Sequence, residues 1–311
     1  MVAKDMRLRQ QGRMLRLILA LLAVSAAAVG FLYVRQPAAL LNGIDALWRG
    51  PGGELVADGV AYGSLPRQRL DIWRPVGAGN DDDRPVIIFI HGGSWDSGAR
   101  GQYGFAGRAL ASQGFVTAVI DYRLGVEGRF PAMVQDSAAA TAWVLRNIAR
   151  YGGDPQRVVI AGHSAGAYNA AMIALDPQWL RAAGSDPARL RGVAALAGPF
   201  DFYPFDGPKT RAAFGHVANA ERATQPIAFA RGDAPPLWLA TGLVDVSVRP
   251  RNSARLAAAV QALGGQAEVK TYAGIDHGDI VMALSRPWRA KAPILADMAA
   301  FAHQVTGIAP E

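Results

Sequence analysis

The run Val158 to Leu175 constrains the fold more than any other stretch of this chain. Four apolar residues lead into Gly162-His163-Ser164-Ala165-Gly166, and an alanine-rich segment typical of a helix follows. A strand that turns sharply into a helix leaves a serine at the corner, with its hydroxyl clear of the sheet edge. We expect glycines there because the strand and helix backbones pass close together. The amide of Ala165 would begin the helix and point toward a negative oxygen above Ser164.

Strands and helices are expected to alternate along most of the chain. Residues 85–90 form a continuous apolar run without alternation, which is typical of a strand buried on both faces. Further strands are predicted at residues 54–62, 68–73, 115–120, 190–196, 237–241 and 267–272, and helices at 103–113, 130–150, 251–263 and 292–305. The first two strands would pair as an antiparallel hairpin. This order predicts an α/β domain over residues 54–311, with a mostly parallel central sheet flanked by helices.

Residues 198–236 interrupt this alternation. Aromatic residues are interleaved there with prolines, which predicts a small lid inserted into the α/β domain. Phe200 and Phe202 from this segment, together with Trp95, are candidates for lining a substrate pocket. The alternative that these aromatic residues form the core of the lid itself stays open.

The basic residues of the chain are concentrated near its amino end. The net charge is +7, yet residues 1–36 contain six basic residues and one acidic residue, which leaves +2 for the remainder. A nucleic-acid-binding surface is therefore not expected. The chain has no cysteine, which excludes disulfides, thiolate metal ligands and a cysteine nucleophile.

An apolar run of 18 uncharged residues extends from Leu17 to Val34. At about 1.5 Å per residue, a helix of this length nearly spans a hydrocarbon core of about 30 Å. We expect an uncleaved signal anchor with a basic cytoplasmic segment over residues 1–36, and a linker over 37–53. The catalytic domain would then lie on the exported, periplasmic or extracytoplasmic side. The alternative is a signal peptide that is cut after Ala28, which would give a secreted protein.

A serine hydroxyl needs a base that accepts its proton, and histidine has a suitable pKa. Of the five histidines, His277 lies in a loop directly after a predicted strand and before a helix. Side chains at such positions converge on one edge of an open α/β sheet. His277 is therefore the expected base.

The base in turn needs a carboxylate that fixes its tautomer and stabilises its charged form. Asp245 follows the strand that precedes His277, so the chain order is Ser164, Asp245, His277, and each follows a predicted strand. Asp201, which follows the predicted strand at residues 190–196, is the alternative carboxylate. Asp276 is adjacent to His277 and badly placed to reach its ring.

A second glycine turn follows the buried strand, in His91-Gly92-Gly93-Ser94-Trp95. Backbone amides can stabilise the oxyanion of a tetrahedral intermediate, and we expect those of Gly92, Gly93 and Ala165 to do so. No histidine and carboxylate pair has the spacing of a zinc helix, so no metal site is predicted. The chemistry requires no cofactor.

Together these segments resemble the α/β-hydrolase superfamily, and especially its esterase, lipase and arylformamidase branch with a His-Gly-Gly-x-Trp loop. The resemblance extends from about Glu54 to the last helix. It also includes Asp121-Tyr122-Arg123-Leu124 and Gly152-Gly153-Asp154-Pro155. It implies that Ser164, Asp245 and His277 form a catalytic triad. Two departures affect the mouth of the site: Ser94 replaces a third glycine, and Gly125-Val126-Glu127-Gly128 stands where the branch often has Pro-Glu.

The function expected from these residues is hydrolysis of small carboxylic esters through an acyl-enzyme. One alternative is an amidase of the arylformamidase kind with the same triad, and a deacetylase of cell-envelope sugars is a special case of the esterase. A third is a hydrolase-like domain kept as a binding module, which the complete triad disfavours.

Overall fold

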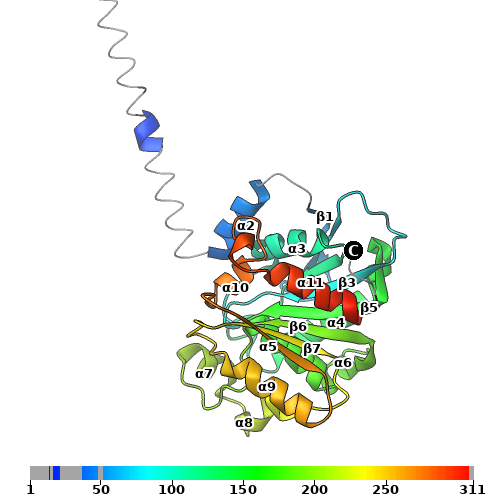
Figure 1. Cartoon of the computed structure of the whole chain (residues 1–311), viewed down its shortest axis with the longest axis vertical. Coiled ribbons are helices and arrows are strands. Elements are labelled where there is room, and N and C mark those ends of the chain that lie inside the picture. Colours follow the sequence, from blue (N-terminus) through cyan, green and yellow to red (C-terminus); the bar gives the residue numbers. More distant parts are fainter. Residues whose placement is uncertain (1–13, 15–16, 22–36, 48–51, 308–311) are drawn as a thin grey trace, which may run out of the picture.

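The computed structural model describes residues 14, 17–21, 37–47 and 52–307. Eight strands form one sheet in the order β1-β2-β4-β3-β5-β6-β7-β8 (Figure 1). Their bounds are β1 Gly53–Ala61, β2 Arg69–Pro75, β3 Arg84–Ile90, β4 Val116–Ile120, β5 Gly153–His163, β6 Leu190–Leu196, β7 Leu237–Gly242 and β8 Ala267–Tyr272. The β1–β2 and β2–β4 pairs are antiparallel and all other pairs are parallel. The mostly parallel sheet of an α/β-hydrolase fold and its leading hairpin are confirmed.

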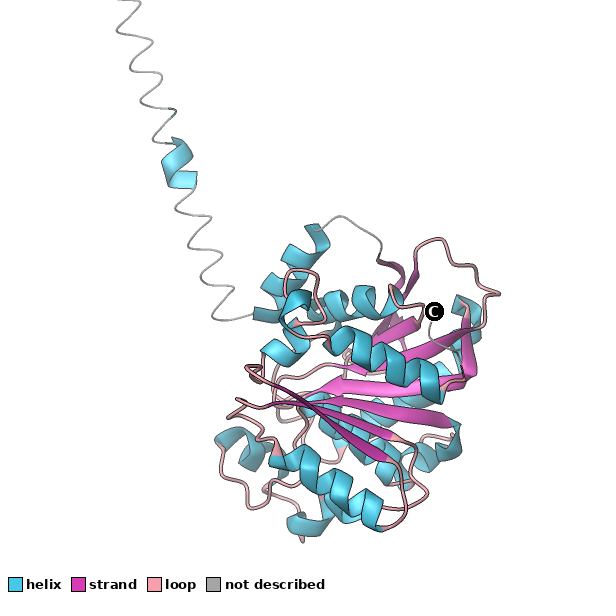
Figure 2. Cartoon of the chain, in the orientation of Figure 1, coloured by secondary structure: helices cyan, strands magenta, loops and turns pink. Residues whose placement is uncertain are grey.

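Helices cover both faces of the twisted sheet (Figure 2). The longer ones are α3 Gly104–Ala111, α4 Ala132–Asn147, α5 Ala165–Leu175, α9 Arg251–Ala262 and α11 Ile294–Val305. Shorter helices are α6 Gln178–Ala182, α7 Pro208–Phe214, α8 Ala220–Ala223 and α10 Asp279–Met282. Short 3-10 turns are η1 Arg100–Tyr103, η2 Ile148–Tyr151, η3 Pro187–Arg189, η4 Pro226–Phe229 and η5 Arg289–Lys291.

The two helical layers explain why β3 is apolar throughout. Ile88 and Ile90 belong to the buried cluster that includes α4 and α5, whereas Ile87 and Phe89 belong to the cluster that includes α3 and α11. All four side chains are fully buried. Successive strand residues point to opposite faces, so a strand between two helical layers needs apolar side chains at every position.

Residues 37–47, which we predicted to be part of a linker, form the helix α2 Pro37–Leu47. It is held against the domain by Asp45, whose buried carboxylate accepts hydrogen bonds from Arg108 Nε and the amide of Arg286, both at 2.8 Å. Pro37 does not prevent the helix because proline is tolerated in a first turn. The glycines that suggested a linker begin only at Gly50.

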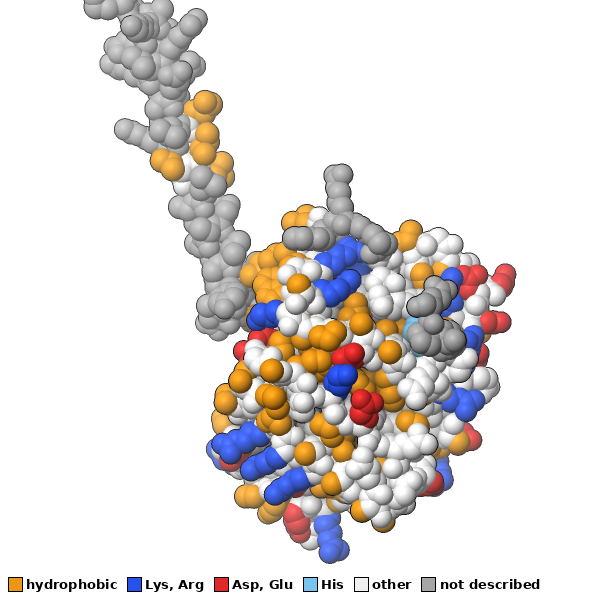
Figure 3. All heavy atoms as spheres, viewed as in Figure 1, with side chains coloured by type: hydrophobic (Ala, Val, Ile, Leu, Met, Phe, Trp, Pro, Cys, Tyr) orange, Lys and Arg blue, Asp and Glu red, His pale blue; other side chains and the backbone are white. Residues whose placement is uncertain are grey.

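Most of the predicted membrane anchor, residues 22–34, lies outside the described residues. Within the described ranges, no helix has both the length and the apolar character needed to cross a bilayer. On the face seen in Figure 3, basic and acidic side chains are interspersed among hydrophobic and uncharged ones.

Candidate active site

Ser164 stands at the corner between β5 and α5, with φ of 54° and ψ of −117°. This left-handed backbone is unusual for a residue with a side chain and marks a strained turn. A Cβ on Gly162 would lie 2.4 Å from the backbone of Gly166, and one on Gly166 would lie 2.0 Å from the carbonyl oxygen of Ile90. Only glycine therefore allows the strand and helix to approach as closely as this corner requires.

The structure brings Ser164, Asp245 and His277 together. His277 Nε2 lies 2.9 Å from Ser164 Oγ, and His277 Nδ1 lies 2.8 Å from Asp245 Oδ2. Because a carboxylate only accepts, Nδ1 carries the proton and Nε2 is free to accept one from the serine hydroxyl. The three residues follow β5, β7 and β8, whose carboxyl ends lie at one edge of the sheet.

Asp245 is buried and its geometry is fixed by the backbone around it. Oδ1 accepts hydrogen bonds from the amides of Ser247 and Val248, both at 2.8 Å. Burial acts to raise the pKa of Asp245, but the hydrogen bond from His277 and those from the two amides outweigh it and hold the pKa below its usual value. The carboxylate therefore stays ionised beside His277.

The rival acids have other partners. Asp201 Oδ2 lies 2.6 Å from Arg255 Nη1 in an ion pair on the lid side of the cavity. Asp276 Oδ1 accepts hydrogen bonds from the amides of Gly278 and Asp279 at the start of α10. Asp245 is thus the one of the three candidate acids that meets the ring of His277.

The glycine turn after β3 lies directly beside this corner. A Cβ on Gly92 would lie 3.3 Å from Ser164 Cβ. Gly93 has φ of 123°, and Ser94 and Trp95 also have positive φ, so the backbone turns sharply here. The three predicted amide donors, Gly92, Gly93 and Ala165, therefore belong to two backbone segments that meet beside Ser164.

A cavity of about 720 Å³ opens over Ser164 and His277. Trp95 and Phe202 line it, as we predicted for a pocket. Phe200 does not: its side chain is fully buried, with the ring against Gly198. Phe200 and Phe202 lie in the irregular segment before α7, where the sequence offers no periodicity that distinguishes a core-facing from a cavity-facing phenylalanine.

Trp95 connects the glycine turn to the lid. Its ring packs edge-on against Tyr168 and Phe214 and is stacked on Phe202, with centroid distances of 5.2, 4.7 and 6.1 Å. Its Nε1 donates to Asn169 Oδ1 at 3.2 Å. Some aromatic residues of the lid, such as Phe214, therefore form a core around Trp95, whereas Phe202 also lines the cavity.

Sequence reasoning missed a buried charge network beneath the glycine turn. Arg100 donates to Asp71 Oδ1 at 2.6 Å and to Asp121 Oδ2 at 3.0 Å. Arg67 donates to the carbonyl of Gly98 at 2.8 Å and to Asp121 at 3.2 Å. Burial would raise the pKa of Asp121, but His91, whose Nε2 lies 3.4 Å from Oδ1, together with the Arg100 amide and Arg67 keeps it below its usual value. The network holds both ends of the turn.

Asp121 belongs to Asp121-Tyr122-Arg123-Leu124, a segment that we used only as part of the resemblance. Its position directly after a central strand is the signal that could have suggested a role near the site. The hydroxyl of Tyr122 donates to the carbonyl of His91 at 3.1 Å, and the two rings stack at 4.6 Å. This segment therefore supports the glycine turn from below.

The histidines outside this cluster contact backbone groups elsewhere. His216 Nε2 lies 2.8 Å from the carbonyl oxygen of Phe130, and His303 Nε2 lies 2.9 Å from that of Gln113. In the part of the chain that the structure describes, no group of three or more histidine and carboxylate side chains is placed to hold a metal ion.

Comparison with known families gives a match over most of this domain. The sequence model of the BD-FAE family matches residues 70–260, which span β2 to α9 and include Ser164 and Asp245. His277 lies beyond the matched segment.

Similar curated proteins are named as esterases. The probable isoprenylcysteine alpha-carbonyl methylesterase ICMEL1 of Oryza sativa subsp. japonica is 32% identical over 250 residues, which cover 73% of this chain and 58% of the rice protein. Esterase LipC of Mycobacterium tuberculosis is 37% identical over 149 residues, which cover 46% of this chain and 36% of LipC. This chain thus spans little more than half the length of the rice relative.

Solved structures share the fold at low sequence identity. Butyrate-bound esterase 2 of Thermogutta terrifontis superimposes with a TM-score of 0.68 at 22% identity, covering 84% of this chain and 97% of that one. A truncated carbohydrate esterase from gut microbiota gives a TM-score of 0.67 at 20% identity, covering 81% and 96%.

Proposed function

Because this chain belongs to the BD-FAE family, we propose that it is a carboxylesterase that acts through an acyl-enzyme on Ser164. The observation that carries the proposal is the continuous hydrogen-bonded chain from Asp245 through His277 to Ser164, with distances of 2.8 and 2.9 Å. The esterase names of the relatives support the same reaction class.

In the proposed first step, Ser164 Oγ attacks the ester carbonyl carbon while His277 Nε2 takes the hydroxyl proton. Asp245 keeps the proton on Nδ1 and stabilises the imidazolium that forms. The tetrahedral intermediate then collapses, the bond to the alcohol oxygen breaks, and His277 returns the proton to that oxygen. A water molecule, activated by His277, then attacks the acyl-enzyme carbonyl carbon. The bond to Ser164 Oγ breaks, His277 returns the proton to that oxygen, and the acid is released.

The negative oxygen of each tetrahedral intermediate would lie between the glycine turn and the first turn of α5. The amides of Gly92, Gly93 and Ala165 are the proposed donors. The positive end of the α5 dipole favours the same site. Such donors act only as charge develops, so they stabilise the transition state more than the bound ester.

Hydrolysis of p-nitrophenyl acetate, butyrate and octanoate by the full-length chain tests this reaction. We expect turnover with all or part of the series, and the chain-length profile will report the size of the acyl site. Paraoxon should phosphorylate one residue, and peptide mass spectrometry should locate the adduct on Ser164. Turnover that survives full modification of Ser164, or an adduct on another serine, would contradict the proposal.

We also propose that residues 17–34 anchor the protein in a membrane, with the hydrolase domain on the exported side. The support is the 18-residue uncharged run and the basic residues that precede it. A fragment that begins at Pro37 keeps α2 and should leave the membrane fraction with full esterase activity. A fragment that still sediments with membranes would contradict the anchor.

A further inference from the structure

His163, the residue before the serine, takes part in no step described above, yet it lies at the centre of the site. Its side chain is buried at the end of β5. Nε2 lies 2.9 Å from the backbone carbonyl oxygen of His277, and the two imidazole rings are 5.0 Å apart. A carbonyl oxygen only accepts, so Nε2 of His163 carries the proton and donates it.

Three loops of the site meet on this one ring. His163 is covalently next to Ser164 and hydrogen-bonded to the loop that carries His277. A Cβ on Gly92 would lie 2.9 Å from His163 Nδ1, so the glycine turn packs against the opposite side of the ring. The segments that follow β3, β5 and β8 therefore all meet at the side chain of His163.

The charge state of His163 suits this position. Burial, reinforced by His277, lowers its pKa to about 3 against the opposing effects of the hydrogen bond and of Asp245. Its Nδ1 has no hydrogen-bond partner among the described residues. His163 therefore stays neutral at the pH of ester hydrolysis and adds no positive charge beside His277 when that ring accepts a proton.

We propose that His163 is a positioning residue: its Nε2–H holds the backbone of His277 so that the ring of His277 keeps both hydrogen bonds. The inference rests on the proposed function, since it gives His277 the role of the base. A displacement of the His277 backbone would move Nε2 away from Ser164 and Nδ1 away from Asp245. Misplacement by about 1 Å can cost on the order of 100-fold in rate.

Two variants of the full-length chain separate the hydrogen bond from simple packing. His163→Met keeps a side chain of similar length without a donor, whereas His163→Gln keeps a neutral amide donor near the position of Nε2. With p-nitrophenyl acetate, we expect the methionine variant to lose roughly 10- to 100-fold in kcat with little change in KM, and the glutamine variant to recover most of the loss. Each rate is divided by the concentration of sites titrated with paraoxon.

The pH profile gives a readout that packing alone would not change. Without the donor, His277 is held less well against Asp245, so its protonated form is less stabilised. The acid limb of kcat/KM should therefore move to lower pH in the methionine variant and return in the glutamine variant. A methionine variant within twofold of the parent, or equal losses in both variants, would overturn the proposal.

The tautomer can be tested without any turnover. The chain has five histidines, so ¹⁵N-histidine NMR of the full-length protein in detergent is tractable, and the signal missing from His163→Gln identifies His163. We expect a neutral ring protonated on Nε2 between pH 8 and pH 5. A ring protonated on Nδ1, or charged in this range, would overturn the proposal. Absence of turnover in the parent chain would instead count against the proposed function.

Discussion

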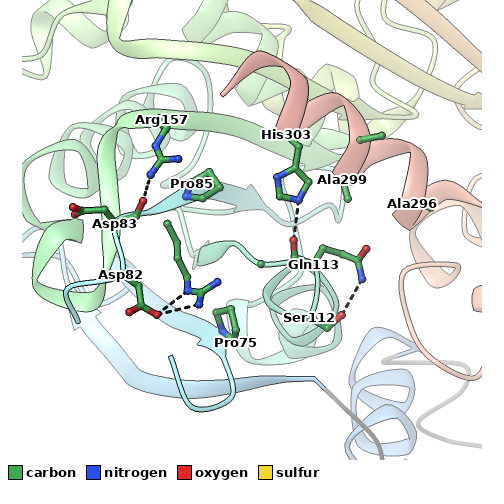
Figure 4. A pocket seen from close by; sticks show the side chains of 13 residues that line it. Pro75, Asp82, Asp83, Pro85, Ser112, Gln113, Arg157, Ala296, Ala299 and His303 are labelled. Carbon is green, nitrogen blue, oxygen red and sulfur yellow. Dashed lines mark hydrogen bonds and ion pairs between the residues drawn. The ribbon is translucent and has the colours of Figure 1, made fainter. Parts of the chain in front are cut away.

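Each edge of the sheet carries a cavity, and the two cavities differ in organisation rather than in size. The cavity over Ser164, at the carboxyl ends of the parallel strands, measures about 720 Å³. The other, at the opposite edge, measures about 770 Å³ and is lined by residues such as Arg84, Arg157 and His303 (Figure 4).

The basic side chains of the second cavity end on a carboxylate or on a backbone carbonyl oxygen. Arg84 pairs with Asp82 at 3.0 Å, Arg157 donates to the backbone carbonyl of Asp83, and His303 contacts the carbonyl oxygen of Gln113 (Figure 4). At the Ser164 edge, in contrast, the hydrogen bonds are donated in one direction, from a hydroxyl to an imidazole and from the imidazole to a carboxylate. Cavity volume therefore does not identify the reactive edge, whereas a directed chain of polar groups from several strands does.

The largest difference in kcat between the two edges is expected when a serine at each edge is replaced by alanine. Ser164→Ala removes the nucleophile and should lower kcat by about 10⁶-fold. Ser112→Ala, in the cavity at the other edge, should leave kcat unchanged. Esterase assays on both variants with matched melting temperatures measure this, and equal activity of the two would remove the distinction between the edges.

Asp245→Asn should lower kcat by about 10⁴-fold, because an amide favours the wrong tautomer of His277. Asp201→Asn is the control within the same cavity and should change kcat by less than about tenfold, since it disrupts only the ion pair with Arg255. Steady-state kinetics of both variants decide between them. A larger loss at Asp201 would show that the acid has been misassigned.

The ion pairs at the two edges should differ in their effect on stability. Arg100→Met leaves Asp71 and Asp121, whose side chains are 6% exposed, without their shared guanidinium, which should cost about 3–5 kcal/mol. Arg84→Met breaks a pair in which both side chains are about one-third exposed, and it should cost much less because solvent screens such a pair. Urea denaturation measures the unfolding free energy of both variants. Similar losses would show that burial does not make the Arg100 ion pairs more important for stability than the Arg84 pair.

The glycine turn can be tested by adding a single methyl group. A Cβ on Gly93 would lie 2.1 Å from the carbonyl oxygen of Ser97, so Gly93→Ala should displace the turn and lower kcat by about 10²- to 10³-fold. Gly101→Ala is the matched control, because no atom outside its immediate chain neighbours lies within 4 Å of a Cβ there. Normal turnover by Gly93→Ala would exclude this turn as the oxyanion site.

The last expected effect is a pH dependence of stability from His163. Its pKa in the folded protein is about 3, below the ordinary value of 6.5. Between these values the unfolded chain binds a proton that the folded protein does not, so acidification lowers stability by at most about 1.4 kcal/mol per pH unit from this group. His163→Gln should flatten the fall in unfolding free energy from pH 6.5 to pH 4. An unchanged slope would contradict this.

The strands and the converging loops could be predicted because their signals are local. Residues 85–90 are apolar throughout, and Ser164 and Asp245 each come shortly after such a run, whereas His277 follows the alternating strand at residues 267–272. Parallel strands place the loops at their carboxyl ends on one edge, so chain order alone brings the three residues near one another. Their catalytic roles remain predictions until the variants are assayed.

The features that could not be predicted depend on contacts between distant segments. Arg100 meets Asp71 and Asp121 only because β2 lies beside β4 in the sheet. The helix α2 depends on Asp45 reaching Arg108, 63 residues further along the chain. Neither pairing leaves a periodic pattern in the sequence, and the hydrogen bond from His163 to the His277 backbone leaves none either.

The docking of α2 has a consequence for how the enzyme would search for its substrate. A flexible linker over residues 37–53 would let the domain range about 20–25 Å from an anchor. With α2 fixed to the domain, only Arg35 and Gln36 separate the apolar run from Pro37, a contour of roughly 7–10 Å. An anchored domain of this kind would sample a thin layer next to the bilayer, so its encounter rate would depend on the amount of ester per membrane area more than on the bulk concentration.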